Sequence, residues 1–210
     1  MGDAHEELLN VYDDDANVVG QAPRRAAKAG GRAVGAVNLL LVNGRGEVLL
    51  QKRPADKENG GRWDKSVGGH VAAGEDFDAT ALRETSEELF GVAASPRARL
   101  VASREALVSP TAPLDLEHAV VFYRASLQRG LRDVRHAPGG GLRNVVYHVA
   151  IYLGRTETRI ESFTPQKDEI DALRYAPAAE LDGLLLRGEL APNMAFLWLT
   201  HARQLLGLVG

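Results

Sequence analysis

The first half of the chain alternates short apolar runs with polar turns, a pattern typical of β-strands joined by hairpins. Leu8 to Tyr12 and Asn17 to Gly20 flank the acidic turn Asp13-Asp14-Asp15, which predicts a small N-terminal hairpin. The apolar run Ala33 to Val42 is followed by turn residues and then by Glu47 to Lys52. This arrangement predicts a second hairpin.

The rest of the chain mixes further strands with helices. The Ala/Arg-rich stretch Arg24 to Gly31 is expected to be a polar link, and Gln128 to Arg143, with Pro138-Gly139-Gly140-Gly141, is expected to be a loop. Further strands are predicted at Ala98 to Ser103, Ala119 to Ala125 and Val145 to Gly154, and helices at Pro177 to Leu186 and Met194 to Leu206. In the last helix, the apolar side chains available to cover a sheet are Phe196, Leu197, Leu199 and Leu205.

Between Asp76 and Phe90 the apolar spacing changes to the helical period, which places Ala79, Leu82 and Leu89 on one side. Asp76 is a suitable N-cap. Gly91, directly after this segment, is expected to end the helix.

The same predicted helix carries three glutamates on one face. Glu84, Glu87 and Glu88 stand at i, i+3 and i+4, so they project within roughly 100° of one another and away from the packed side. Like charges at this spacing each cost about 0.2–0.5 kcal/mol in an isolated helix. A solvated acidic face is one interpretation, and a bound hard cation such as Mg²⁺, which prefers carboxylate oxygens, is the other.

Composition and length indicate one soluble domain with an appendage. The chain has 210 residues, of which 45% are hydrophobic and 25% charged. We expect residues 1–31 to form an N-terminal hairpin extension and residues 32–210 to form the main domain, ending in the C-terminal helix.

The charge pattern narrows the class of partner. The 25 basic and 28 acidic residues give a net charge of −3 and are interleaved, so no basic face for nucleic acid is expected. No apolar run approaches the roughly 18–20 residues of a membrane span, and the acidic start MGDAHEELL does not have the form of a signal peptide, so we expect a cytoplasmic protein. There is no cysteine and no histidine pair at ligand spacing, which disfavours a zinc site.

Six residues around the predicted helix follow a fixed pattern, G-x5-E-x7-R-E-x-x-E-E, formed by Gly69, Glu75, Arg83, Glu84, Glu87 and Glu88. This pattern resembles the Nudix box. Two departures concern the helix end and its packing: Thr85 stands at an aliphatic position, and Phe90 stands where the box has a glycine. The resemblance implies an α/β/α sandwich with a mixed β-sheet.

The same resemblance implies roles for these residues. Glu84, Glu87 and Glu88 would bind a catalytic Mg²⁺ or Mn²⁺, and Gly69 would add a backbone carbonyl oxygen. Glu75 and Arg83 would brace the loop on the helix. The implied reaction is cleavage of a phosphoanhydride bond in a nucleoside diphosphate-linked or other organic diphosphate.

Outside the box, two stretches are similar to the isopentenyl diphosphate isomerase branch of this superfamily. NGRGEVLLQKRPADK carries Arg53 and, four residues on, Lys57, which would bind the diphosphate, and WDKSVGGH contains His70. The isomerase's catalytic cysteine has no counterpart in a chain without cysteine, and the glutamate set is intact. A hydrolase is therefore favoured over an isomerase or a non-catalytic, nucleotide-sensing module.

The general base remains open between several glutamates. Glu169 lies in a late loop where many Nudix hydrolases carry one, Glu117 is a second candidate, and a base within the box, Glu87 or Glu88, is the third. Glu169 is equally compatible with an exposed turn. We further expect a small-molecule substrate, and a homodimer through the N-terminal segment is a reasonable hypothesis.

Overall fold

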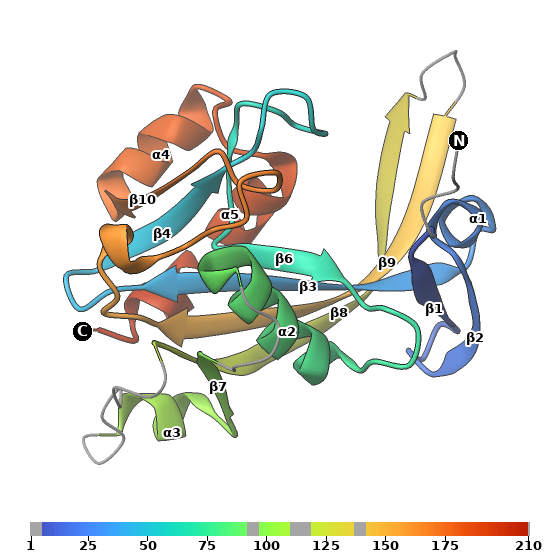
Figure 1. Cartoon of the computed structure of the whole chain (residues 1–210), viewed down its shortest axis with the longest axis horizontal. Helices are drawn as coiled ribbons and strands as arrows, with labels where there is room; N and C mark the ends of the chain where they lie inside the picture. Colours follow the sequence, from blue (N-terminus) through green and yellow to red (C-terminus); the bar gives the residue numbers. More distant parts are fainter. Residues whose placement is uncertain (1–5, 92–96, 110–118, 137–141, 210) are drawn as a thin grey trace.

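The computed structural model describes residues 6–91, 97–109, 119–136 and 142–209. Within them the chain forms strands and helices in alternation (Figure 1). The strands are β1 (Leu8–Tyr12), β2 (Val18–Pro23), β3 (Ala33–Val42), β4 (Glu47–Lys52), β5 (Trp63–Asp64), β6 (Val67–His70), β7 (Ala98–Val101), β8 (Val120–His136), β9 (Leu142–Arg155) and β10 (Ala172–Pro177). The helices are α1 (Arg24–Ala29), α2 (Phe77–Phe90), α3 (Arg104–Val108), α4 (Ala178–Leu186), α5 (Pro192–Leu206) and the short 3-10 helix η1 (Ile160–Ser162).

One mixed sheet runs through the molecule in the order β10-β4-β3-β9-β8-β7. The pairs β3–β9 and β7–β8 are parallel, whereas β10–β4, β3–β4 and β8–β9 are antiparallel. The central strand β3 also pairs with β6 and, at its start, with β1. Its near-continuous apolar sequence is what a strand covered on both faces requires.

Helices cover both faces of this sheet, as Figure 1 shows. Leu39 and Leu41 of β3 belong to the apolar cluster under α2, whereas Leu40 and Val42 belong to the cluster under α4 and α5. This alternation follows from the two-residue period of a strand. The predicted α/β/α sandwich with a mixed sheet is therefore confirmed.

The N-terminal hairpin forms as predicted, with Val11 paired to Gly20. The expected polar link after it is wrong in part, because Arg24–Ala29 forms the helix α1. Ala27 of α1 packs on Val34 of β3 and Leu9 of β1 in a small apolar cluster of its own. The hairpin is thus attached to the start of the central strand.

The predicted loop Gln128 to Arg143 is also wrong, because β8 and β9 continue through it as a long hairpin. Pairing extends from Val121↔Arg155 to His136↔Leu142, with register shifts near Ser126 and Leu131. Residues 137–141, which include the Pro-Gly-Gly-Gly tip, lie outside the described part. Arg129, Arg132 and Val134 are exposed there because this part of the hairpin projects beyond the helices (Figure 1). Arg132 and Val134 lie on one face of β8 and are both exposed, so a polar and an apolar residue share that face and the alternation that would have revealed the strand is lost.

The C-terminal helix α5 covers the sheet, but with a different set of side chains from the predicted one. Leu197 and Leu205 are buried as expected, together with Trp198. Phe196 and Leu199 are exposed, because they fall on the opposite side of the helix. In the described residues, no helix is long and apolar enough to cross a membrane.

Candidate functional site

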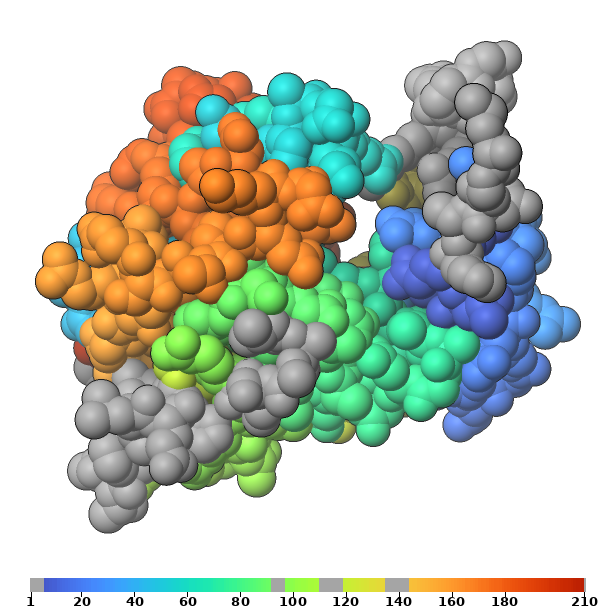
Figure 2. Space-filling view, viewed as in Figure 1, coloured from blue at the N-terminus to red at the C-terminus, as the bar shows by residue number. Residues whose placement is uncertain are grey.

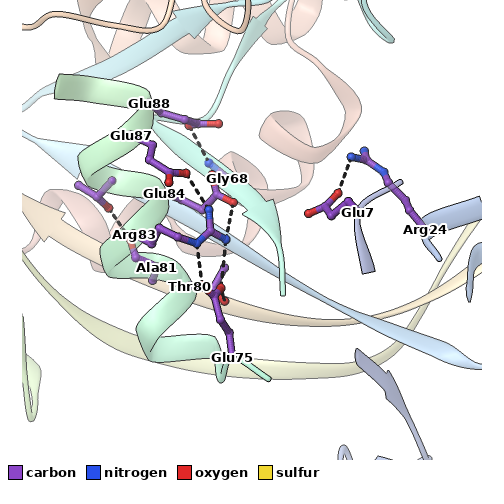
Figure 3. Close-up of polar contacts among 11 residues, drawn as sticks. Glu7, Arg24, Gly68, Glu75, Thr80, Ala81, Arg83, Glu84, Glu87 and Glu88 are labelled. Atoms are coloured by element: carbon purple, nitrogen blue, oxygen red, sulfur yellow. Dashed lines mark hydrogen bonds and ion pairs between the residues drawn. The ribbon is translucent and has the colours of Figure 1, made fainter. Parts of the chain in front are cut away.

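Both predicted ends of helix α2 are confirmed. The Asp76 side chain accepts a hydrogen bond from the Ala79 amide at 2.8 Å, and Gly91 adopts the left-handed conformation with φ of 65°. These two caps fix where the helix begins and ends. They present its glutamates beside strand β6, as Figure 3 shows.

Arg83 connects the loop before α2 to the helix. Its guanidinium forms a two-pronged ion pair with Glu75, at 2.8 Å and 3.1 Å, and Thr80 donates a further hydrogen bond to the same carboxylate. It also pairs with Glu87 at 2.7 Å and with Glu84 at 3.1 Å (Figure 3). Planar, two-pronged binding of carboxylates is the geometry in which arginine outperforms lysine.

Glu84 lies against the backbone of Gly69. A Cβ atom added to Gly69 would stand 2.0 Å from the Glu84 Oε1 atom, so only glycine leaves room for this carboxylate. Burial raises the pKa of Glu84 to about 7, and the nearby Arg83 charge partly opposes that rise. The arrangement places a Glu84 carboxylate oxygen directly against the backbone of strand β6.

Glu88 differs from the prediction, because it is buried rather than turned away from the packed side. Its Oε2 atom accepts hydrogen bonds from the Gly68 amide at 3.1 Å and from the Gln51 side chain at 3.3 Å. Burial, with a contribution from the Glu84 charge, raises the pKa of Glu88 to about 8.

The packed face of α2 is therefore rotated relative to the predicted one. Ala79, expected on that face, is exposed, and Leu82 is only half-buried. Leu89 and Thr85 are buried on the packed face as expected, and Phe77 and Ala81 are buried with them. The buried face thus mixes apolar residues with a small polar one, which blurs its apolar period in the sequence.

The ligand types of this site fit a hard divalent cation, since the glutamates offer carboxylate oxygens and Gly69 provides room for one of them. The described residues contain no ready-made cluster of three or more metal-binding side chains. Glu84 and Glu87 point at Arg83 rather than at one another. Binding an ion would require these two side chains to turn away from Arg83.

Arg53 and Lys57 occupy different surroundings in the segment that follows β4. Arg53 donates to the Glu58 carbonyl oxygen at 2.7 Å and pairs with Asp64 at 3.3 Å. Lys57 is exposed in a turn in which its amide donates to the Pro54 carbonyl. Arg53 is thus fixed in place, whereas Lys57 is carried on the surface.

Lys65 is a residue that the sequence analysis missed. Its side chain is 8% exposed, and its ammonium group lies 3.3 Å from Asp64, the same carboxylate that pairs with Arg53. Its positive charge lowers the pKa of Glu88, against the effect of burial. The signal available in the sequence was its place in WDKSVGGH, directly before the strand that carries Gly68.

The remaining candidates are distributed around this centre. Glu169 is exposed in a turn, and its charge contributes to the raised pKa of Glu88, so the two carboxylates lie within electrostatic reach. His70 stacks near Tyr147, with 6.1 Å between ring centroids. Glu117 lies outside the described residues.

Figure 2 shows a hollow in the surface that is bordered by segments from different parts of the sequence. One side is formed by the segment after β4 (cyan) and the segment before β10 (orange), and the other side by the N-terminal hairpin (blue). Segments that are far apart in the sequence therefore border one depression.

Comparison with known proteins identifies the family. Residues 32–198, most of the chain, match the NUDIX domain. The chain belongs to the Nudix family. An uncharacterized Nudix hydrolase of Streptomyces coelicolor, SCO1686, is 40% identical over 93 residues, which cover 44% of this chain and 51% of that protein. Isopentenyl-diphosphate Delta-isomerase 2 of Photorhabdus laumondii is 33% identical over 85 residues, which cover 40% of this chain and 48% of the isomerase.

A solved structure supports the fold. DR0079 from Deinococcus radiodurans superposes with a TM-score of 0.58 at 22% identity, covering 94% of this chain and 98% of that chain. The predicted membership of the Nudix superfamily is confirmed. The chain spans about half the length of the first curated relatives that it matches, and both hydrolases and an isomerase are among them, so the branch and the activity are matters of proposal.

Proposed function

We propose that this Nudix protein is a metal-dependent hydrolase that cleaves the phosphoanhydride bond of a nucleoside diphosphate-linked or other organic diphosphate. The observation that carries the proposal is the arrangement of Glu84, Glu87 and Glu88 on α2 beside Gly69, with Arg83 between the helix and its preceding loop. The whole reaction would take place in the hollow seen in Figure 2.

Glu84, Glu87 and Glu88 would hold Mg²⁺ or Mn²⁺, with the Gly69 carbonyl oxygen as a further ligand. When bound, such an ion neutralises diphosphate charge and polarises the phosphorus centre. Glu75 would act indirectly, by keeping Arg83 in position through its two-pronged ion pair. Arg83 would in turn limit where the glutamates can move.

A carboxylate that takes a proton from the attacking water is the second requirement of this reaction. Glu169, Glu87 and Glu88 are the candidates among the described residues, and Glu117 is a further one outside them. Glu88 is supported by its pKa of about 8, which suits proton transfer near neutral pH, and Glu169 by its electrostatic reach to Glu88.

Cations would orient the diphosphate. Arg53 and Lys57 are proposed to bind its oxygens, with Arg53 the better-ordered of the two because Asp64 holds it. Lys65, which shares Asp64, extends this positive region towards Glu88. These positive side chains would then orient the diphosphate beside the glutamates of α2.

The test is to incubate the protein with Mg²⁺ and a panel of nucleoside diphosphate-linked and other organic diphosphates, and to identify products by mass. We expect two phosphate-containing products from one substrate class. Glu87→Gln and Glu88→Gln should each reduce turnover by orders of magnitude without unfolding the protein. Glu105→Gln, at an exposed glutamate of α3, is the matched control and should leave turnover unchanged.

Two other outcomes would contradict this proposal. A product of unchanged mass from an allylic diphosphate would indicate an isomerase, the function that the lack of cysteine disfavours. Stabilisation by a nucleotide without any turnover would indicate a sensing module.

We also keep as proposals the division into residues 1–31 and 32–210, the homodimer through the N-terminal segment, the lack of nucleic-acid and membrane partners, and the cytoplasmic location. Size-exclusion chromatography with light scattering would test the homodimer.

A further inference from the structure

Strand β1 lies along the loop that leads into α2, although the two are more than 60 positions apart in the sequence. The Ala73 amide donates to the Leu8 carbonyl oxygen at 2.8 Å, and the Asn10 amide donates to the Val71 carbonyl oxygen at 3.4 Å. Leu9 forms a bridge with Ala72 between these two contacts. The N-terminal hairpin thus holds the backbone of the loop, residues 71–75.

The Asn10 side chain completes this contact with both ends of its amide group. Its Nδ2 atom donates to the Glu75 carbonyl oxygen at 2.8 Å, and its Oδ1 atom accepts from the Gly74 amide at 3.1 Å. Asn10 is only 1% exposed, so water does not replace either bond. A buried side chain whose donor and acceptor are both used fixes its partners strongly, because losing one bond leaves a desolvated group unpaired.

The loop residue that Asn10 holds is the one that positions the glutamates. The backbone of Glu75 is bound by Asn10, and its carboxylate forms the two-pronged ion pair with Arg83. Arg83 contacts Glu84 and Glu87. A continuous chain of polar contacts therefore runs from the N-terminal hairpin to two of the proposed metal ligands.

A ring contact and a nearby carboxylate bring the hairpin close to the same centre. The Tyr12 ring packs on Phe77, the first residue of α2, with 5.6 Å between centroids. Glu7, paired with Arg24 at 2.9 Å, points from the hairpin towards the region of Gly68 and Glu84 in Figure 3. All of these hairpin residues precede residue 32, where the match to the NUDIX domain begins.

We propose that Asn10 is a positioning residue of the active site, and that the N-terminal hairpin is part of the catalytic unit rather than an appendage. Asn10 fixes the loop, the loop fixes Glu75, and Glu75 holds Arg83 in place. Because Arg83 pairs with Glu84 and Glu87, its position sets how far these two carboxylates must turn to bind metal. The inference rests on the proposed function for its metal-binding step, but the fixing of the loop is independent of that function.

The experiment compares Asn10→Ala, Asn10→Asp and the matched control Asn17→Ala. Asn17 lies in the same hairpin, and its side-chain amide donates to the Asp13 carboxylate at 3.1 Å. Its replacement therefore tests the hairpin turn without touching the loop. Thermal melts give the melting temperature of each variant, so that the other measurements are made on folded protein below that temperature. Amide hydrogen exchange then measures the order of the loop, Mn²⁺ titration followed by electron paramagnetic resonance measures ion affinity, and kcat and KM are measured separately.

In Asn10→Ala we expect faster exchange at Gly74, Mn²⁺ binding weakened by roughly tenfold or more, and a lower kcat, as for partners that orient metal ligands. Asn10→Asp keeps the acceptor for Gly74 but sets a carboxylate against the Glu75 carbonyl. Gly74 should therefore stay protected while Mn²⁺ binding weakens. Asn17→Ala should match the native protein in exchange, Mn²⁺ affinity and kcat.

The proposal is overturned if folded Asn10→Ala shows native exchange at Gly74, or if it binds Mn²⁺ and turns over like Asn17→Ala. A lowered melting temperature with native Mn²⁺ affinity would mean that Asn10 has a structural role alone, which also overturns it. Failure of the native chain to bind Mn²⁺ would refute the proposed function, while the exchange data would still decide whether Asn10 fixes the loop.

Discussion

At the scale of single residues, the buried Glu88 makes the metal-free protein sensitive to pH. The unfolded chain has an ordinary glutamate pKa near 4.5, whereas burial raises the native value to about 8. Between these values the native state binds more protons than the unfolded state, so the free energy of unfolding falls as pH rises. One such group contributes a slope of at most about 1.4 kcal/mol per pH unit.

We therefore predict that urea unfolding in a chelator shows stability decreasing between pH 5 and 8, and that Glu88→Gln reduces this decrease. Glutamine keeps an oxygen for the Gly68 amide but carries no charge at any pH. A smaller decline remains from Glu84, whose pKa is about 7. Equal slopes in the native protein and the variant would contradict the buried position of Glu88.

Gly69 provides a second residue-scale prediction. A methyl group at this position would overlap the Glu84 carboxylate, with 2.0 Å between the added Cβ and Oε1. Gly69→Ala should therefore displace Glu84 and lower kcat. Mn²⁺ binding should weaken by roughly tenfold or more, as is typical when the groups that orient a metal ligand are disturbed. Gly20→Ala is the matched control, because a Cβ there meets nothing within 4 Å.

The residue pattern alone predicted which glutamates share helix α2, but not how deeply each one is buried. The box pattern placed Glu84, Glu87 and Glu88 together, yet burial of Glu88 depends on β6, a strand whose approach to the helix is a tertiary contact. Lys65 was not predicted for the same reason. A lysine between polar neighbours is normally solvated, whereas the Lys65 side chain is buried because it packs against Gly68 in the folded protein.

At the scale of elements, helix α2 depends on its C-terminal glycine. Gly91 has φ of 65°, a conformation that costs a residue with a side chain about 1–2 kcal/mol, and an added Cβ would also lie 3.0 Å from the Thr164 carbonyl oxygen. We predict that Gly91→Ala lowers the free energy of unfolding by about 1 kcal/mol or more in urea titrations. An unchanged midpoint would contradict the cap.

The elements that sequence reasoning found, and those it did not, differ in where their side chains lie. Strand β3 and the caps of α2 carry local signals, a long apolar run and an Asp/Gly pair, and both were predicted correctly. The outer part of β8 and β9 is held by backbone pairing, and polar and apolar side chains are mixed along it without regular alternation, so the Gly-rich tip was the stronger signal in the sequence. Helix α1 is six residues long and likewise carried no apolar period.

At the scale of the whole molecule, metal binding should appear as stability. An ion that binds only the native state adds about 2.7 kcal/mol when its concentration is 100 times its dissociation constant. We predict that Mg²⁺ or Mn²⁺ raises the melting temperature of the native protein, and that Glu84→Gln and Glu87→Gln abolish most of this rise. The exposed Glu105→Gln variant should keep it. A native melting temperature that does not respond to either ion would refute the metal assignment.

Gly68 and Gly69 stand side by side in β6 and face opposite sides of the strand. Lys65 occupies the space beside the first, and Glu84 occupies the space beside the second. The backbone of these two glycines, which has no side chain, therefore lies between Lys65 and Glu84. The Lys65 charge lowers the pKa of Glu88, so replacing this lysine is a way to retune that carboxylate without changing any glutamate.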